Sequence, residues 1–396
     1  MRFLHNIPKR LFVRILVSVS LISATYLSIS AQDWRSVHDG VEYAEVTRTI
    51  DNQPVRMNLL RLDLKKVRLD VVHAMDAAIG TETVSSMAMR HKALAGINAG
   101  FFRLDNSIWA GDPAGIFFVD GEALSEPVNQ RVALEIFNNG SISTEVFIDH
   151  LGLKETMVIG DKTFEVSGIN RERKDNELVL YSAQFHRKSL TSDDGIEFSV
   201  VNNKIYRVYR GRGNNPIPDN GFLLSASGTA AAQLAELVHV GVGVTPNQAM
   251  SGFHQDKSGR FIRNGNGWDI VGGVPQLVKN GKIDITWQEE KTTKSFVETR
   301  HPRTAVAILK DGKFLMVTVD GRSESSGGIS LNDLAAYLLE LGATDAMNLD
   351  GGGSTTMYLD GKIVNRPSDK EGERAVSDAL IVTLRGKVRS LTNGRK

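Results

Sequence analysis

Short runs of alternating apolar and polar residues recur along this chain, and they restrict its fold more than any other feature. Residues 41–50 and 55–72 follow this pattern, which is typical of antiparallel strands with one buried face. Turn dipeptides such as Asp120-Gly121 and Asp311-Gly312 separate further apolar runs, as in β-hairpins. The regular strand–helix alternation of a doubly wound sheet or a TIM barrel is missing. The pattern predicts an α+β (mixed α/β) fold with largely antiparallel sheets and a few packing helices.

A few segments carry helix signals. Thr83 is placed to cap a short helix over residues 84–91. Ser330, with an aspartate three residues later, precedes the clearest amphipathic run and predicts a second capped helix. An alanine-rich segment predicts a helix over residues 230–238. Residues 239–266 have little period, so we expect a long surface loop there.

The first 31 residues differ from the rest of the chain. Four basic residues and no acid precede or enter an apolar run over residues 11–29, and small residues follow up to Ala31. This arrangement predicts a secretory signal peptide, residues 1–31, and therefore a protein that is exported to the periplasm or secreted. The alternative is an uncleaved membrane anchor, because the run is almost long enough to span a bilayer. The polar residues Gln32-Asp33 favour cleavage and no stable membrane insertion afterwards.

Charge and cysteine content exclude several classes of function. Removing four positive charges from a net charge of +1 leaves −3, which argues against general nucleic-acid binding. The chain has no cysteine, so disulfides, thiolate metal sites and a cysteine nucleophile are excluded. No phosphate-binding P-loop, Gly-x-Ser-x-Gly motif or His-x-x-x-His pair occurs. The sequence therefore requires no cofactor, and a divalent metal is possible but unsupported.

Polar residues stand where several predicted strands end. The strongest case is the apolar run 346–349, which ends on Asp350 and is followed by three glycines and Ser354. Glycines let another molecule approach the main chain closely, and successive amides in such a turn can bind an anion such as phosphate. Asn98 and Asp320 follow two other predicted strands. Loops at strand ends commonly carry functional sites, although a glycine turn alone is as often only a sharp bend.

These blocks together resemble the phosphodiester glycosidase family. The resemblance rests on the following segments, in this order: Asn98-Ala99-Gly100-Phe101-Phe102, residues 219–228, His301-Pro302-Arg303-Thr304, Asp320-Gly321-Arg322, Asn348 to Ser354, Asn365 to Ser368 and Gly372 to Val376. It covers about residues 80–385. Ala99 stands where the family usually has glycine, and Val274 interrupts a Gly-Gly-x-Pro pattern, so the substrate preference stays open.

The resemblance implies an enzyme that hydrolyses the C1–O bond of a sugar-1-phosphodiester, such as an N-acetylglucosamine-1-phosphodiester. Such a transition state needs a nearby carboxylate and electrostatic stabilisation of the leaving phosphate. Asp350, Asp320 and Glu373 are the catalytic candidates. The expected phosphate and substrate ligands are Asn98, Arg303, Arg322, Gly352, Gly353, Ser354, Asn365 and Arg374. Two alternatives remain open: a non-catalytic protein that binds an envelope polymer or exopolysaccharide, and a metal-assisted phosphodiesterase.

The same comparison divides the chain. We expect a small β-rich accessory region or extra strands over residues 32–80, a phosphodiester glycosidase domain over 81–386 and a C-terminal tail over 387–396. The expected partner is a carbohydrate or glycan phosphodiester.

Overall fold

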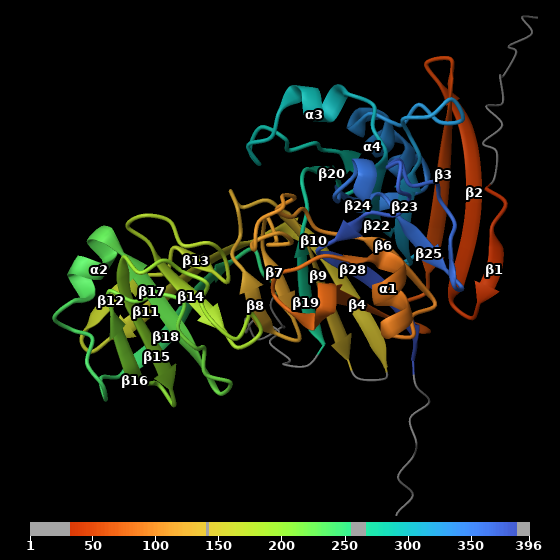
Figure 1. Ribbon diagram of the computed structural model, residues 1–396. Helices are drawn as coiled ribbons and strands as arrows, with labels where there is room; N and C mark the ends of the chain where they lie inside the picture. Colours follow the sequence, from red (N-terminus) through yellow and green to blue (C-terminus); the bar gives the residue numbers. More distant parts are fainter. Residues whose placement is uncertain (1–31, 140–141, 255–266, 386–396) are drawn as a thin grey trace, which may run out of the picture. The chain divides into compact units, whose positions relative to one another are not determined.

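The computed structural model describes residues 32–139, 142–254 and 267–385 (Figure 1). The expected signal peptide, residues 1–31, and the expected tail, residues 387–396, lie outside the described residues. The chain divides into the units Met1–Gln32 and Asp33–Lys396, and the description below concerns the second unit. Antiparallel strands dominate it and the few helices are short, so the coarse prediction of a mixed fold holds, with more β-structure than expected.

The largest sheet has eight antiparallel strands. Their order is β1 (Arg35–His38), β2 (Val41–Ile50), β3 (Gln53–Leu62), β23 (Phe314–Val319), β22 (Arg303–Leu309), β24 (Ala343–Asn348), β20 (Gln276–Lys279) and β21 (Lys282–Ile283). Strand β3 pairs with the whole length of β23, from Phe314 opposite Leu62 to Val319 opposite Met57. The N-terminal strands are therefore part of the main sheet. Of the two expectations for residues 32–80, extra strands agree with the structure. Local sequence pattern does not show which distant strand a segment joins.

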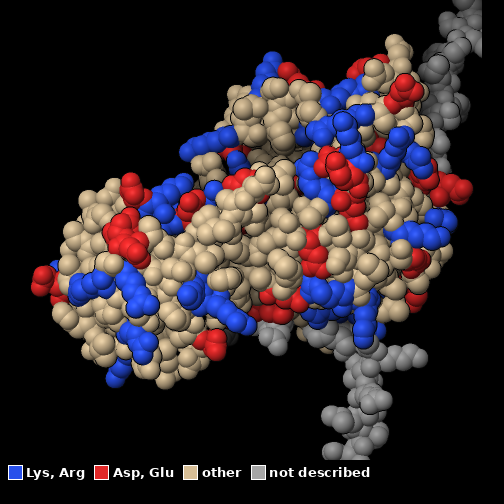
Figure 2. Space-filling model, in the orientation of Figure 1, with Lys and Arg blue, Asp and Glu red and all other residues tan. Residues whose placement is uncertain are grey.

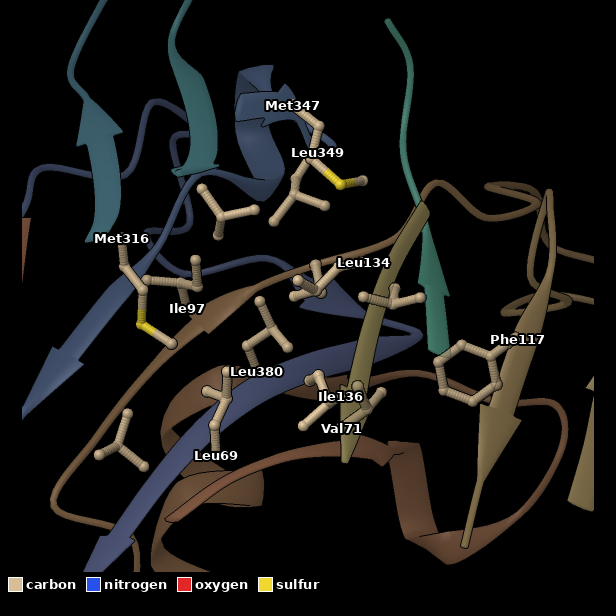
Figure 3. Close-up of a cluster of buried hydrophobic side chains, with 14 of the residues drawn as sticks. Leu69, Val71, Ile97, Phe117, Leu134, Ile136, Met316, Met347, Leu349 and Leu380 are labelled. Carbon is tan, nitrogen blue, oxygen red and sulfur yellow. The ribbon is translucent and has the colours of Figure 1, made fainter. Parts of the chain in front are cut away.

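Two five-stranded sheets share one apolar core with this sheet. One has the order β26 (Lys362–Ile363), β25 (Met357–Leu359), β6 (Ala95–Asn98), β28 (Asp378–Leu384) and β4 (Val67–His73). The other has the order β10 (Ser143–His150), β9 (Val132–Asn139), β19 (Trp268–Gly272), β7 (Phe117–Val119) and β8 (Glu122–Ser125). Figure 3 shows side chains of β4, β6, β9 and β28 meeting Met316 of β23 and Met347 of β24. This burial provides the main free-energy gain of folding in a chain without disulfides.

Residues 152–251 form two further sheets around a core of their own. The three-stranded sheet has the order β12 (Lys162–Glu165), β11 (Gly152–Ile159) and β18 (Val244–Ser251). The five-stranded sheet has the order β13 (Gly168–Ile169), β14 (Leu178–Ser182), β17 (Gly221–Ser227), β15 (Gly195–Val201) and β16 (Lys204–Arg210). Strand β18 lies inside the segment predicted as a loop, so that prediction is wrong there. Residues 255–266 of the same predicted loop lie outside the described residues.

The helices begin where their caps predict. Thr83 Oγ1 accepts a hydrogen bond from the Ser86 amide at the start of α1 (Val84–Arg90), and Ser330 Oγ accepts one from the Asp333 amide at the start of α4 (Leu331–Glu340). Helix α2 (Gly228–Leu234) is shorter than predicted. The remaining elements are α3 (Lys294–Glu298), the 3₁₀ turns η1 (Ala74–Asp76) and η2 (Gly352–Ser354), and the paired strands β5 (Glu82–Thr83) and β27 (Ala375–Val376).

Three strand ends meet at one end of the eight-stranded sheet. Arg303, the first residue of β22, lies opposite Val319, the last residue of β23. The end of β24 lies beside β22, with Asn348 opposite Ala305. Antiparallel pairing therefore brings the loops after β23 and β24 to the same edge, as the sequence predicts for the polar residues that follow both strands.

The surface carries mixed charge. Positive and negative side chains are interspersed over the face shown in Figure 2, in keeping with 47 basic and 46 acidic residues in the chain. None of the helices in the described part of the chain has the length and apolar character needed to cross a bilayer.

Candidate functional site

Asp350 lies in the loop after β24, and hydrogen bonds to residues at the end of β6 and just before β22 hold this loop in place. Its amide donates to the Ala99 carbonyl at 2.9 Å, and its carbonyl accepts from Asn98 Nδ2 at 2.7 Å. The Gly352 amide donates to the Pro302 carbonyl at 2.9 Å. A side chain at Gly351 would place its Cβ 2.7 Å from that carbonyl, so the loop can pack there only without one. The loop is thus rigidly joined to β6 and β22.

The Asp350 carboxylate is partly buried and has two local donors. Its Oδ1 accepts the Gly351 amide at 2.9 Å, and the Ser354 hydroxyl also bonds to it. Burial raises the pKa of Asp350 from 3.8 to about 6, although the two donors and the positive charge of Arg374 act in the opposite direction. A carboxyl group with this pKa can exchange a proton near neutral pH, as an acid–base or nucleophilic role requires.

The glycine turn offers fewer free amides than the sequence suggests. Three of the four amides of residues 351–354 donate within the protein: Gly351 to Asp350, Gly352 to Pro302 and Ser354 to Gly351. Among these four residues only the Gly353 amide is left without a partner inside the described chain. A bound anion would therefore depend on one amide and on neighbouring side chains, and the expectation of several converging amides is wrong.

Two arginines lie against successive glycines of this turn. Arg374 packs on Gly353, where an added Cβ would lie 2.0 Å from its Nη2. Its Nη1 is 3.5 Å from Ser354 Oγ, and its Nε and Nη2 donate to the Asp369 carboxylate at 2.7 and 3.0 Å. Arg322 lies over Gly352, where an added Cβ would lie 3.0 Å from its Nη2. The structure thus brings Asp350, Ser354, Arg374 and Arg322 to one loop.

Asp378 is a carboxylate near this site that was not among the sequence candidates. It is 1% exposed at the start of β28. Its Oδ1 accepts the Gly100 amide at 2.5 Å and its Oδ2 accepts the Ser377 hydroxyl. Burial raises the pKa of Asp378 to about 6, and the negative charge of Asp350 adds to this effect. A buried aspartate directly before the apolar run Ala-Leu-Ile-Val is the signal that could have identified it.

Several predicted ligands instead hydrogen-bond to the protein's own backbone. Arg303 is 2% exposed, and its Nη2 donates to the Phe296 and Thr299 carbonyls at 2.6 and 2.9 Å. Asn98 accepts from the Thr304 hydroxyl and the Thr356 amide, in addition to its bond to Asp350. Asn365 bonds to the Met357 amide and the Thr355 carbonyl. These contacts give all three a structural role and argue against direct ligand binding.

The other two catalytic candidates are also engaged. Glu373 accepts the amide and the hydroxyl of Ser85 at 2.8 and 2.6 Å, at the first turn of α1. Asp320 is 2% exposed, and its Oδ1 accepts the Arg366 amide at 2.9 Å. Burial is the main cause that raises the pKa of Asp320. Of the three candidates, Asp350 is the one whose surroundings suit a reacting group.

A separate cavity lies away from Asp350. Its volume is about 560 Å³, and residues of β4, β19 and β28 line it, with Asp269 among them. Asp269 accepts amides of Val71 and Asp120, and Asp70 in the same wall pairs with Arg68. Among the described residues, no group of three or more His, Asp or Glu side chains is placed to hold a metal ion.

The second half of the chain matches a known family. Residues 195–383 match the family model described as phosphodiester glycosidase. The N-acetylglucosamine-1-phosphodiester alpha-N-acetylglucosaminidase of Bos taurus is 37% identical over 109 residues, which are 25% of this chain and 20% of that protein. An uncharacterized protein of Rickettsia conorii is 29% identical over 239 residues, 59% of this chain and 77% of that protein. The chain thus spans only a fifth of the bovine protein's length.

Solved structures show the same fold over most of the chain. A hypothetical protein from Synechocystis superposes with a TM-score of 0.75 at 22% identity, covering 90% of this chain and 64% of that one. A protein of Burkholderia pseudomallei K96243 that is named for its expected export superposes with a TM-score of 0.71 at 26% identity. The superposition covers 84% of this chain and 74% of that one. These structures show the fold, whereas the resemblance to the family is confirmed by the family model over residues 195–383.

Proposed function

We propose, from the premise that this chain belongs through residues 195–383 to the phosphodiester glycosidase family, that it is a hydrolase acting on a sugar-1-phosphodiester. In this reaction the bond between C1 and the phosphate oxygen breaks, and the bonding electrons leave with that oxygen. Water supplies the new oxygen at C1 and releases one proton. The products are a free sugar and a phosphomonoester.

The observation that carries this proposal is the linked group Asp350, Ser354 and Arg374. Ser354 bonds to the Asp350 carboxylate, and Arg374 approaches the Ser354 hydroxyl at 3.5 Å. Carboxylate and guanidinium therefore lie on the two sides of one hydroxyl, so a sugar carbon and its phosphate can be contacted together. Such fixed charges stabilise a transition state without reorganising during the reaction.

Hydrolysis of a sugar-1-phosphodiester requires one accessible carboxylate rather than a pair of carboxylates that act as acid and base. The phosphomonoester that leaves is weakly basic, so it departs without protonation, and the carboxylate is needed at C1 as nucleophile or as base for water. Asp350 is partly exposed and is suited to this position. Asp378 is enclosed and acts on Asp350 through the Ala99-Gly100 segment, whose amides and carbonyl bond to both residues. We therefore assign Asp378 as a positioning residue.

We also propose that the protein is exported, which the signal-like residues 1–31 support. The structural likeness to a Burkholderia pseudomallei protein named for its export is consistent with this localisation. A glycan phosphodiester of the envelope would be available to the enzyme there. Expression of the full chain followed by fractionation and N-terminal sequencing would test this proposal, and retention of residues 1–31 in the cytoplasm would contradict it.

The test of the reaction is the isosteric substitution Asp350→Asn, assayed with an N-acetylglucosamine-1-phosphodiester. We expect kcat to fall by at least about 100-fold, since a positioned acid or base typically contributes that much. The exposed residue Asp175 provides a matched control, and Asp175→Asn should keep full activity. Circular dichroism would verify folding. Unchanged turnover in a folded Asp350→Asn protein would remove Asp350 from the mechanism.

Product analysis separates the two alternatives from this proposal. Free N-acetylglucosamine is the expected product. Release of sugar phosphate that stops on addition of EDTA would instead indicate a metal-assisted phosphodiesterase. Saturable binding without any product would indicate a non-catalytic glycan-binding protein.

A further inference from the structure

Arg322 and Arg366 are two exposed arginines on adjoining loops, and each contacts a serine of the opposite loop. Arg322 Nη1 lies 3.5 Å from Ser368 Oγ in the second loop, and Arg366 Nη1 lies 3.3 Å from Ser325 Oγ in the first. The two contacts are reciprocal, so each loop fixes the arginine of the other. The Asp320 carboxylate supports the same arrangement by accepting the Arg366 amide at 2.9 Å.

Neither guanidinium is neutralised by a carboxylate. Within the described residues, neither Arg322 nor Arg366 forms an ion pair, and their side-chain partners are neutral hydroxyls. Arg374, by contrast, is paired with Asp369. A guanidinium group that forms no ion pair within the protein keeps its charge available to a bound anion. Planar guanidinium groups are well suited to phosphate oxygens.

The position of Arg322 relates this pair to the proposed reaction site. Arg374 lies against Gly353 and reaches Ser354, whereas Arg322 lies against Gly352, one residue along the same turn. Gly352 has φ = +63°, and Arg322 itself has φ = +57°, which is costly for a residue with a long side chain. Strain of this kind is retained mostly where the orientation of a residue matters. Two guanidinium groups thus lie against successive glycines of the turn that follows Asp350.

We propose that Arg322 and Arg366 form a second anion subsite, which receives a phosphate group beyond the scissile one. The inference rests on the proposed function and refines it: the substrate class is a glycosyl phosphodiester whose leaving group carries a second phosphate. A glycosyl diphosphate ester and a polymer unit with spaced phosphates share this chemistry.

The first test measures binding and does not depend on turnover. Inorganic pyrophosphate and inorganic phosphate are titrated into the protein by calorimetry. Pyrophosphate should bind at least about tenfold more tightly, since one additional charge-assisted contact corresponds to about that factor. In Arg322→Gln and Arg366→Gln this ratio should fall towards one. Arg207→Gln, at an exposed arginine of β16, should keep the wild-type ratio. Equal affinities in the wild-type protein, or an unchanged ratio in both variants, would overturn the proposal.

The second test compares substrates. UDP-N-acetylglucosamine carries adjacent phosphates, N-acetylglucosamine-1-phospho-glycerol 3-phosphate carries spaced ones, and the methyl ester of N-acetylglucosamine 1-phosphate carries one. A lower KM for UDP-N-acetylglucosamine would indicate a glycosyl diphosphate ester as the substrate, and a lower KM for the glycerol 3-phosphate compound would indicate a polymer unit with spaced phosphates. Arg322→Gln should raise the KM of the preferred substrate about tenfold. Equal KM values for all three substrates would exclude the second subsite while the hydrolase stands. No cleavage of any, with pyrophosphate selectivity retained, would exclude the hydrolase while the subsite stands.

Discussion

Asp350 and Asp378 differ in what they can contact, although burial raises the pKa of both to about 6. Asp378 has both oxygens engaged and is almost completely enclosed, so its charge acts on its neighbours rather than on a ligand. Asp350 is partly exposed at the end of the sheet. A carboxyl group that titrates near pH 6 should give kcat/KM an acidic limb near that pH, rising towards higher pH, if the ionised form reacts.

The raised pKa of Asp378 also predicts how stability depends on pH. The folded protein keeps this proton between about pH 4 and pH 6, whereas the unfolded chain has released it. The stabilising contribution is therefore full below pH 4 and is lost as the pH rises through about 6. Asp378→Asn should reduce the fall in unfolding free energy between pH 4 and pH 8 by up to roughly 3 kcal/mol. Urea titrations at both pH values would measure this difference, with Asp175→Asn as control. An identical pH dependence in the variant would contradict the assignment.

Gly353 has a steric role that can be tested directly. A Cβ atom there would lie 2.0 Å from Arg374 Nη2 and 2.3 Å from Asp369 Oδ1, so Gly353→Ala must displace the guanidinium. We expect kcat/KM to fall by about 100-fold, because a shift of about 1 Å in a positioning group has this effect. The melting temperature should change little, since Gly353 has no left-handed φ to lose. Wild-type kinetics in the folded variant would show that Arg374 does not act in the reaction.

The sequence identified the site at the level of loops better than at the level of atoms. It placed Asp350 and the glycines at a strand end, where the structure has them. The sequence did not reveal that the side chains of Asn98, Arg303 and Asn365 form hydrogen bonds within the protein, mostly to backbone atoms. Those partners are brought close only by folding: Asn98 and Asp350 are 252 residues apart in sequence. Side-chain type is a local property, whereas the partner of a side chain is not.

At the scale of the element, Glu373 shows how a polar residue can support a helix end. Its carboxylate accepts both donors of Ser85, in the first turn of α1, where backbone amides have no partner within the helix. Its negative charge also complements the helix dipole. Glu373→Ala should therefore lower the unfolding free energy by about 1 kcal/mol, whereas Glu373→Gln should keep most of the turnover. Turnover lost in a fully folded Glu373→Gln protein would instead restore the catalytic role predicted from sequence.

Elements with local signals were predicted well. The caps at Thr83 and Ser330 predicted the starts of α1 and α4, and the hairpin with the Asp311-Gly312 turn is present as β22 and β23. Strand β18 was missed because residues 244–251 lack a clear period and lie in a sheet whose faces are partly exposed. Its assignment depends on β11, whose residues lie about a hundred positions earlier in the chain. Where the local pattern is weak, pairing with a distant strand determines whether a segment forms a strand.

At the scale of the whole molecule, residues 33–80 are required to complete two sheets. Strand β3 covers the edge of β23, and β4 pairs with β28 from His73 opposite Asp378 to Val67 opposite Leu384. Asp378 thus sits on a strand whose outer neighbour comes from the N-terminal segment. The reaction site therefore depends on strands that lie outside the segment matched by the family model, residues 195–383.

This dependence predicts that Leu59→Ala destabilises the entire unit. Leu59 of β3 is fully buried in a cluster with Leu315 and Val317 of β23 and Leu334 of α4. Removing its side chain should cost about 2–5 kcal/mol, and unfolding followed by tryptophan fluorescence and by enzyme activity should shift together. Val240→Ala, at a side chain that is 69% exposed, is the matched control and should have little effect. If the N-terminal strands were an independent region, Leu59→Ala would instead separate two transitions and leave the midpoint measured by activity unchanged. Because β3 lies between β2 and β23 in one hydrogen-bonded sheet, we expect a single transition.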